Sequence, residues 1–532
     1  MITPGPRRHR RAIAAATAAL LASIPLSGCG PGDRQQRDDA VPAALRPFYE
    51  QELRWEPCGE QQCATLDVPM DYTAPGNGRT FTLPLIRVTA GNRDRRIGSL
   101  VFNPGGPGES GVAMLRDGGI ETFGERLRER FDIVGFDPRG VGGSRPAIDC
   151  GADDEAEPTG EADEADSGPH TLHPATARQR AAALTAAEQT AAACREHSGA
   201  ILPHVGTTDA ARDMDVLRAA LGDAGLSYLG WSYGTSLGTA YGELFPRKVR
   251  AMVLDGAIDP SLTWSQRALS QARGFREAVD DYAEHCSDVV GEACPAGTPE
   301  AVRGLLKRLY EATADRPLPV EDSEWGLDTA TLHSAVTTSM YTPEEQWEPL
   351  SLALGEADRG DGTRLAAIAA GEPPAEDEQN AEEESPATDD ETVDSTGDAD
   401  SALTAVNCVD IPHPKDPREY WEALDEAHRA EGDHGSDAVV AALGCKGWPQ
   451  AGPGPHRVRA DGLPPVLVVG TTGDPSTPYH EAQSLARQLP HGMLLTYEGL
   501  GHTAYGRAGA CVDTAVDAYL VDLTPVEPGK TC

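Results

Sequence analysis

Basic residues and long apolar runs are scarce in this chain of 532 residues. Only 45 lysines and arginines stand against 84 aspartates and glutamates, which gives a net charge of −39. A surface of this sign repels phosphate, so we expect no nucleic-acid partner. Beyond the N-terminal segment no run of 18 or more apolar residues occurs, so we expect no membrane-spanning helix there. The length could hold three domains, or a larger α/β domain with an insertion.

The negative charge is concentrated in two tracts. Residues 151–167 hold eight acids and no base, and residues 372–400 hold thirteen acids and no base. Neither tract has enough apolar surface to offset the entropy lost on ordering. We therefore expect solvated insertions in a moderately acidic globular protein. Metal buffering is the alternative, but carboxylates without histidine or cysteine make poorly selective sites.

The N-terminus has the pattern of an export signal. A basic region, Arg7–Arg11, precedes an apolar stretch, Ala12–Pro25, that is too short to span a membrane. The following Leu-Ser-Gly-Cys, ending at Cys29, resembles the lipobox of bacterial lipoproteins, although an ordinary cleavage site is the alternative. The resemblance implies that residues 1–28 are removed and that Cys29 is acylated. We expect an exported chain, anchored by lipid on the outer face of the cell membrane or released, with residues 29–50 as a tether.

The cysteine count favours disulfides. Without Cys29 ten cysteines are left, an even number that suggests five bridges in an exported protein. A metal site is the alternative, but no C-x-x-C spacing occurs. The count leaves the connectivity open, and chain order suggests these neighbouring pairs: Cys58–Cys63, Cys150–Cys194, Cys286–Cys294, Cys408–Cys445 and Cys511–Cys532.

Strand-like and helical segments alternate in both terminal parts of the chain. This rhythm predicts an α/β fold with a mostly parallel sheet and helices on both faces. The helix expected over 209–221 would have Thr207 or Thr208 as its N-cap. The predicted strands are 81–88, 99–103, 131–137, 227–230, 251–255, 465–470 and 492–497.

The middle of the chain interrupts this rhythm. Residues 261–450 are mostly helical, and we predict that they form a cap inserted into one interrupted domain, whose parts are 51–260 and 451–532. The helices expected in the cap are 265–283, 299–314, 343–356 and 417–430.

A candidate nucleophile lies in the first part of that domain. Gly230-Trp231-Ser232-Tyr233-Gly234 matches G-x-S-x-G, a pattern that a glycine-rich turn can also produce by chance. Here it follows a predicted strand and opens a helix rich in small residues. A nucleophile elbow needs this setting, because the strained turn lifts the hydroxyl above the sheet. We therefore predict that Ser232 is the nucleophile.

A serine nucleophile needs a base on a later loop. His502 follows the predicted strand 492–497 and precedes the last helix. His480 falls on a helix, and His333 and His285 fall in the cap, so none of them has this setting. We predict that His502 is the base.

The acid that orients the base should come between them in chain order. Asp474, in Thr-Gly-Asp-Pro, follows the predicted strand 465–470, although an Asx-turn before Pro475 would use the same residue. Asp255 and Asp259 are rivals, since they follow the strand after the elbow. We favour Asp474.

A glycine-rich turn follows an earlier strand. Asn103-Pro-Gly-Gly-Pro-Gly108 allows backbone N–H groups to approach a substrate carbonyl. A phosphate loop is the competing interpretation, but no Lys-Ser/Thr follows. We expect the oxyanion donors to be the amides of Tyr233 and Gly106.

Taken in order, these motifs resemble a known family. The Asn-Pro-Gly-Gly-Pro-Gly turn, Phe136–Ser144, the elbow, Asp474 and Gly-His502-Thr look like the secreted tripeptidyl aminopeptidases of actinobacteria, over roughly residues 50–532. The resemblance implies an α/β-hydrolase fold with a helical cap, and cleavage of short peptides, tripeptides above all, from a free N-terminus. It implies no metal or organic cofactor, and we expect a monomer.

An exopeptidase must recognise the free ammonium of its substrate. The cap is the part of the chain that can close one end of the cleft, and a buried ammonium needs a carboxylate partner. The candidates are Asp410, Glu344 and Glu345. A carboxylesterase with the same triad is the alternative function, and a non-catalytic peptide-binding lipoprotein is a second one.

Overall fold

The computed structural model describes residues 41–151, 171–321, 323, 325–372, 399–450 and 452–532, and Ala44–Cys532 form one compact unit. The predicted signal peptide and Cys29 lie outside the described residues. So do residues 152–167 and 373–398 of the two acidic tracts.

The described residues contain one nine-stranded sheet with the order β1-β2-β3-β5-β4-β6-β7-β8-β9. The pairs from β1 to β5 along this order are antiparallel, and all later pairs are parallel. This confirms the predicted fold class. The strands are β1 (Glu56–Cys58), β2 (Gln61–Pro69), β3 (Thr80–Val88), β4 (Gly98–Asn103), β5 (Phe131–Phe136), β6 (Leu226–Trp231), β7 (Val249–Asp255), β8 (Val466–Gly473) and β9 (Gly492–Leu500).

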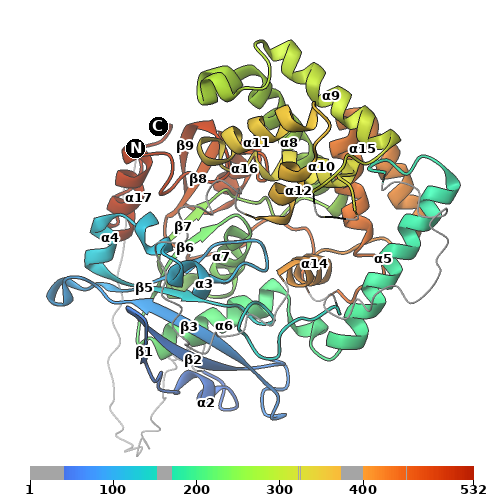
Figure 1. The fold of residues 1–532 in the computed structure, drawn as a ribbon. Coiled ribbons are helices and arrows are strands. Elements are labelled where there is room, and N and C mark those ends of the chain that lie inside the picture. Colours follow the sequence, from blue (N-terminus) through green and yellow to red (C-terminus); the bar gives the residue numbers. More distant parts are fainter. Residues whose placement is uncertain (1–40, 152–170, 322, 324, 373–398, 451) are drawn as a thin grey trace, which may run out of the picture. The chain divides into compact units, whose positions relative to one another are not determined.

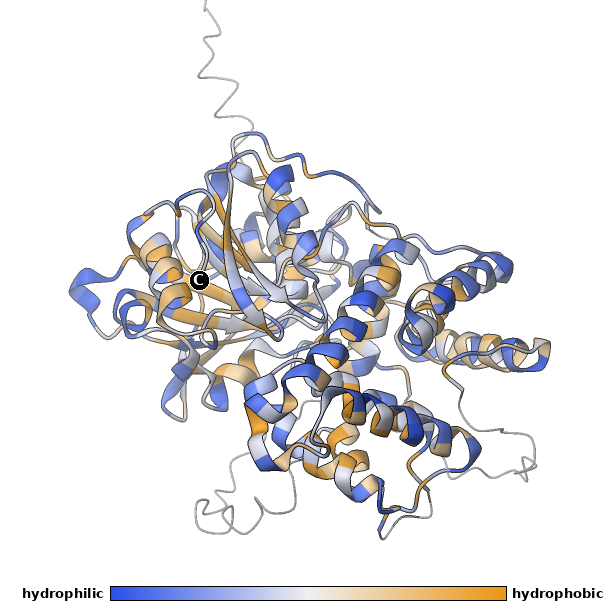
Figure 2. Cartoon of the chain, turned by 90° about the horizontal axis from the view of Figure 1, so that it is seen from above, coloured by the Kyte–Doolittle hydropathy of each residue, from blue (hydrophilic) through white to orange (hydrophobic). Residues whose placement is uncertain are grey.

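Helices cover both faces of the sheet (Figure 1). Successive side chains of a strand point to opposite faces, and in β4 Val101 belongs to one buried cluster while Leu100 and Phe102 belong to the other. The Val101 face packs against α6 (Thr207–Ala220), α7 (Tyr233–Leu244) and α16 (Tyr479–Gln488). The opposite face packs against α3 (Gly111–Arg116), α4 (Glu125–Arg130) and α17 (Ala510–Asp522). Both faces are thus buried, which explains why β4 and β5 are buried along their whole length and are mostly apolar (Figure 2).

A second group of helices lies between β7 and β8 in the chain, and part of it has a hydrophobic core of its own. Trp347, Tyr282 and Leu305 are buried in that core. The helices of this group are α8 (Trp264–Val290), α9 (Pro299–Asp315), α10 (Thr329–Thr338), α11 (Pro343–Ala357), α12 (Thr363–Ala370), α14 (Ala399–Asp410) and α15 (Pro417–Leu443). Helix α14 differs from the others, because its buried residues join the cluster that faces α6 and α7.

Two of the described helices lie outside these groups. They are α2 (Arg46–Tyr49) and α5 (Ala177–Ser198), and α5 begins with a capping box formed by Thr176 and Gln179. The helix expected over 209–221 begins at Thr207, and its N-cap residue is Gly206. The threonine N-cap prediction was therefore wrong: the N–H of Thr207 donates instead to Oδ1 of Asp410, 2.9 Å away on α14.

The ten cysteines after Cys29 form five disulfides. They join the neighbouring pairs that chain order suggested. Disulfides persist in oxidising compartments, so the chain is an exported protein. Within the described residues no helix combines the length and apolar character needed to cross a membrane.

Candidate active site

The turn between β6 and α7 holds Ser232 in a strained conformation. Its φ of 52° and ψ of −119° lie in a region that side-chain-bearing residues rarely adopt. Gly230 and Gly234 allow the turn to be this sharp, since a Cβ on Gly230 would lie 2.5 Å from the carbonyl oxygen of Gly234. The N–H of Ser232 donates to the carbonyl of Asp255 on the neighbouring strand. The sequence therefore folds into the predicted elbow.

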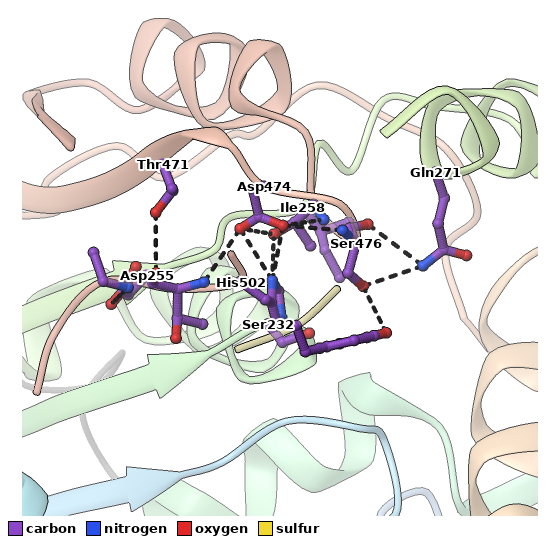
Figure 3. Close-up of polar contacts among 12 residues, drawn as sticks. Ser232, Asp255, Ile258, Gln271, Thr471, Asp474, Ser476 and His502 are labelled. Atoms are coloured by element: carbon purple, nitrogen blue, oxygen red, sulfur yellow. Dashed lines mark hydrogen bonds and ion pairs between the residues drawn. The ribbon is translucent and has the colours of Figure 1, made fainter. Parts of the chain in front are cut away.

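His502 lies in the loop after β9, with Asp474 beside it (Figure 3). Nδ1 of the imidazole is 2.8 Å from Oδ1 and 3.0 Å from Oδ2 of Asp474, and both side chains are buried. Nε2 is also buried and has no hydrogen-bond partner among the described residues. Figure 3 shows the ring between Asp474 and Ser232, so the free nitrogen is available for the serine proton.

Asp474 is fixed by the loop that carries it. Its Oδ1 accepts the N–H groups of Ser476 and Thr477, at 3.0 and 2.8 Å. Its Oδ2 accepts the hydroxyl of Thr477 at 3.0 Å and the N–H of Thr503 at 3.3 Å. The residue thus forms the local turn that we gave as the alternative and also lies against the imidazole.

The rival acids have other partners. Oδ2 of Asp255 accepts the N–H groups of Ala504 and Tyr505, at 3.0 and 2.8 Å, and so holds the loop that follows His502. Burial raises the pKa of Asp255 to about 6. Asp259 accepts hydrogen bonds from other residues, Ser261 and Gln488. Of the three candidates, the structure brings only Asp474 to the imidazole.

The glycine turn after β4 lies against the elbow. Gly105 has a φ of 112°, and a Cβ there would lie 2.9 Å from Cβ of Ser232. Only glycine allows this approach. Gly106 follows with a φ of 91°, and Tyr233 opens α7, where helical hydrogen bonds leave the first N–H groups free. The two predicted oxyanion donors therefore lie on backbone segments that flank the serine.

The Phe136–Ser144 motif supports this turn. Oδ1 of Asp137 accepts the hydroxyl of Ser110 at 2.6 Å, and Oδ2 accepts the N–H of Gly143. Burial raises the pKa of Asp137. Arg139, fully buried, donates two hydrogen bonds to Asp213. The motif thus links the end of β5 to the glycine turn and to α6.

A cap residue that the sequence did not reveal contacts the imidazole loop. The N–H of His502 donates to the carbonyl of Tyr341, at 2.8 Å, and the two rings meet edge to face with centroids 5.2 Å apart. The hydroxyl of Tyr341 lies 3.3 Å from Oγ of Ser476, which also accepts from Gln271 of α8 (Figure 3). Because the main contact uses a backbone carbonyl, no sequence motif could indicate it.

The three carboxylates proposed for the substrate ammonium lie in different settings. Asp410 is engaged by Thr207, whose N–H and hydroxyl both donate to it. Glu344 accepts from Arg507, and Glu345 is exposed without a side-chain partner among the described residues. Both glutamates lie in the first turn of α11, three and four residues after Tyr341. Glu109 is another exposed carboxylate without a described partner, and its Cγ would lie 3.3 Å from a Cβ on Gly106.

The sheet order, the strained serine and the aligned His–Asp pair define a serine hydrolase of the α/β-hydrolase fold. Comparison with known proteins agrees: residues 98–321 match the family model "alpha/beta hydrolase fold", and residues 433–532 match "TAP-like protein".

Three relatives cover nearly the whole chain. Serine protease Hip1 of Mycobacterium tuberculosis is 37% identical over 91% of this chain and 92% of its own length. Carboxylesterase B of Mycobacterium tuberculosis is 35% identical, with coverages of 95% and 94%. Tripeptidyl aminopeptidase of Streptomyces lividans is 33% identical, with coverages of 92% and 88%. The chain therefore belongs to the tripeptidyl aminopeptidase family of α/β-hydrolases.

Proposed function

We propose that the chain is a serine peptidase that works through an acyl-enzyme on Ser232. Nε2 of His502 takes the serine proton as the hydroxyl attacks the substrate carbonyl, and Asp474 holds Nδ1–H and stabilises the imidazolium. The amides of Tyr233 and Gly106 stabilise the developing oxyanion. His502 then protonates the leaving amine, and water releases the acyl group by the reverse sequence. The observation that carries this proposal is the unpartnered Nε2 beside the strained serine.

The proposed reaction is removal of short peptides, tripeptides above all, from a free N-terminus. Support comes from relatives named as a serine protease and a tripeptidyl aminopeptidase. Turnover of a tripeptide p-nitroanilide with a free N-terminus should exceed that of its acetylated form by at least about 100-fold in kcat/KM, or about 2.7 kcal/mol. Equal turnover of the two substrates would contradict exopeptidase action.

The ratio of kcat/KM for the free substrate to that for the acetylated one can identify the carboxylate that binds the ammonium. A carboxylate-to-amide change at the true partner should lower kcat/KM for the free substrate and leave the acetylated one unchanged. Glu345 and Glu109 are the first to test because their side-chain oxygens have no partner among the residues that the structure describes, and Asp410 and Glu344 follow. Glu348→Gln, an exposed position on the same helix as Glu345, is the matched control and should leave the ratio unchanged.

A carboxylesterase is the second candidate, because one relative bears that name. Both functions predict labelling of Ser232 by a fluorophosphonate, with loss of labelling in Ser232→Ala. They differ in preference: an esterase should turn over short acyl p-nitrophenyl esters with a higher kcat/KM than any free tripeptide anilide. A folded chain that resists the probe would instead support the peptide-binding lipoprotein.

We further propose that Cys29 carries the lipid anchor of the exported chain. The lipobox-like sequence supports this. Expression in a bacterium that processes lipoproteins should yield a membrane-bound product, and Cys29→Ser should release it. Release of the unchanged chain, with an unmodified N-terminal peptide by mass spectrometry, would contradict the anchor.

A further inference from the structure

A cavity of about 350 Å³ lies between α7 and α14, and residues of both helices line it. Ser232 and His502 do not line it, but Tyr233, the residue after the serine, does. Its volume falls in the range of small-molecule sites. The cavity therefore adjoins the proposed active site without containing the reacting groups.

Arg267 of α8 brings a positive charge into this cavity. Its guanidinium makes no hydrogen bond or ion pair within the part of the chain that the structure describes. Burial lowers its pKa, although neighbouring acids act to raise it. The acids that line the cavity accept hydrogen bonds from other residues: Asp410 from Thr207, Glu243 from His456, and Asp259 from Ser261 and Gln488. The guanidinium thus has five unused donors.

Two further polar side chains in the cavity are unused. The hydroxyl of Thr239 is buried, and it has no hydrogen-bond partner among the described residues. The side-chain amide of Asn407 on α14 likewise makes no hydrogen bond there. Buried polar groups are normally satisfied, yet the buried hydroxyl of Thr239 has no partner among the described residues. The other two unused groups, on Arg267 and Asn407, are half-buried and line the same cavity. A ligand in the cavity would supply acceptors to all three.

The rest of the wall is largely apolar. Aliphatic side chains from three segments contribute to it: Leu244, Ile258, Leu262 and Ile411. Such a wall suits an apolar body, and a guanidinium pairs best with a carboxylate, which can accept two parallel N–H bonds. The ligand chemistry that matches both features is a small amphiphilic acid.

We propose that this cavity binds a small organic carboxylate with an apolar body, with its carboxylate on Arg267 and Asn407 and its body along α7. This site lies beyond the proposed peptidase chemistry and does not depend on it. The ligand would contact Tyr233, whose amide is a proposed oxyanion donor.

Isothermal titration of the full exported chain carrying Ser232→Ala tests the site without turnover. We expect 3-phenylpropionate to bind with a Kd below about 1 mM, and the neutral 3-phenylpropionamide to bind at least about tenfold more weakly. Adding Arg267→Gln should raise the Kd of the acid at least about tenfold and leave the Kd of the amide unchanged. Arg273→Gln is the matched control, because Arg273 lies on the same helix and pairs with Glu431; it should change the Kd less than about twofold.

Three results would overturn the proposal. Binding of the acid that survives Arg267→Gln would place the ligand elsewhere, and equal binding of acid and amide would exclude charge recognition. Absence of saturable binding up to about 10 mM would mean that the cavity takes no such ligand. If circular dichroism shows that Arg267→Gln is unfolded, Asn407→Ala replaces it. This variant should raise the Kd of the acid but not that of the amide, and an unchanged Kd of the acid would overturn the proposal.

Discussion

Replacing Asp474 with asparagine should inactivate the enzyme while leaving its fold intact. Two backbone N–H groups, from Ser476 and Thr477, point at Oδ1 of Asp474, so the amide oxygen of an asparagine must take that position. The NH2 group then faces Nδ1 of His502. The imidazole must accept this hydrogen bond and carry its proton on Nε2, where it can no longer accept the proton of Ser232.

The expected loss follows from this tautomer change. A wrong tautomer at a well-formed triad costs about 10⁴-fold in kcat, or about 5.4 kcal/mol. Asp255→Asn is the matched control, because Asp255 is equally buried and ends the strand beside the serine turn. Its Oδ2 can be replaced by an amide oxygen that keeps both bonds to the loop after His502. We expect its kcat to stay within about tenfold of wild type.

Single-turnover kinetics with a tripeptide p-nitroanilide would separate the two variants. Circular dichroism melts show that each is folded, and a fluorophosphonate reports the reactivity of Ser232 independently of the substrate. If Asp474→Asn kept activity within about tenfold while Asp255→Asn lost about 1,000-fold, the acid would be Asp255 and the argument from the Asp474–His502 contact would fail.

Four other outcomes follow from the structure. Burial raises the pKa of Asp255 to about 6, so the folded chain binds a proton on this carboxylate more tightly than the unfolded chain does. In urea unfolding, the free energy of unfolding of wild type should therefore fall by up to about 3 kcal/mol relative to that of Asp255→Asn as the pH rises from 4 to 7. Tyr341→Ala, which removes the ring beside the imidazole, should lower kcat by about tenfold, whereas Tyr341→Phe should stay near wild type in the same steady-state assay. The Cys511→Ser/Cys532→Ser double variant should lose about 3 kcal/mol in denaturant unfolding, since its closed loop spans 21 residues; no change would show that the tail is held by other contacts. Deleting residues 376–398 should leave the turnover of a tripeptide anilide within about threefold of wild type, since this tract lacks the apolar residues needed to pack. An unfolded deletion variant would refute that interpretation.

The positions of Ser232, Asp474 and His502 were predictable because each of them follows a strand, and the strand–loop–helix pattern is visible in the sequence. Strand β2 was missed because its outer face is polar, with Thr65 and Asp67 between apolar residues, and so its apolar run is broken. The start of α6 was misplaced because its cap comes from Asp410, about 200 residues away. The contact between Tyr341 and His502 was invisible for a related reason: a backbone carbonyl has the same chemistry at every residue, and only tertiary packing selects one.

The carbonyl of Tyr341 bonded to the N–H of His502 has a consequence for how substrates enter. Tyr341 lies in the connection between α10 and α11. If the cap opened by moving this connection, the hydrogen bond would draw His502 away from Ser232. The enzyme is therefore active only while the connection between α10 and α11 keeps this position. We therefore expect substrates to reach Ser232 without displacing Tyr341, so that short peptides are cleaved and folded proteins, which would need a wider opening, are not.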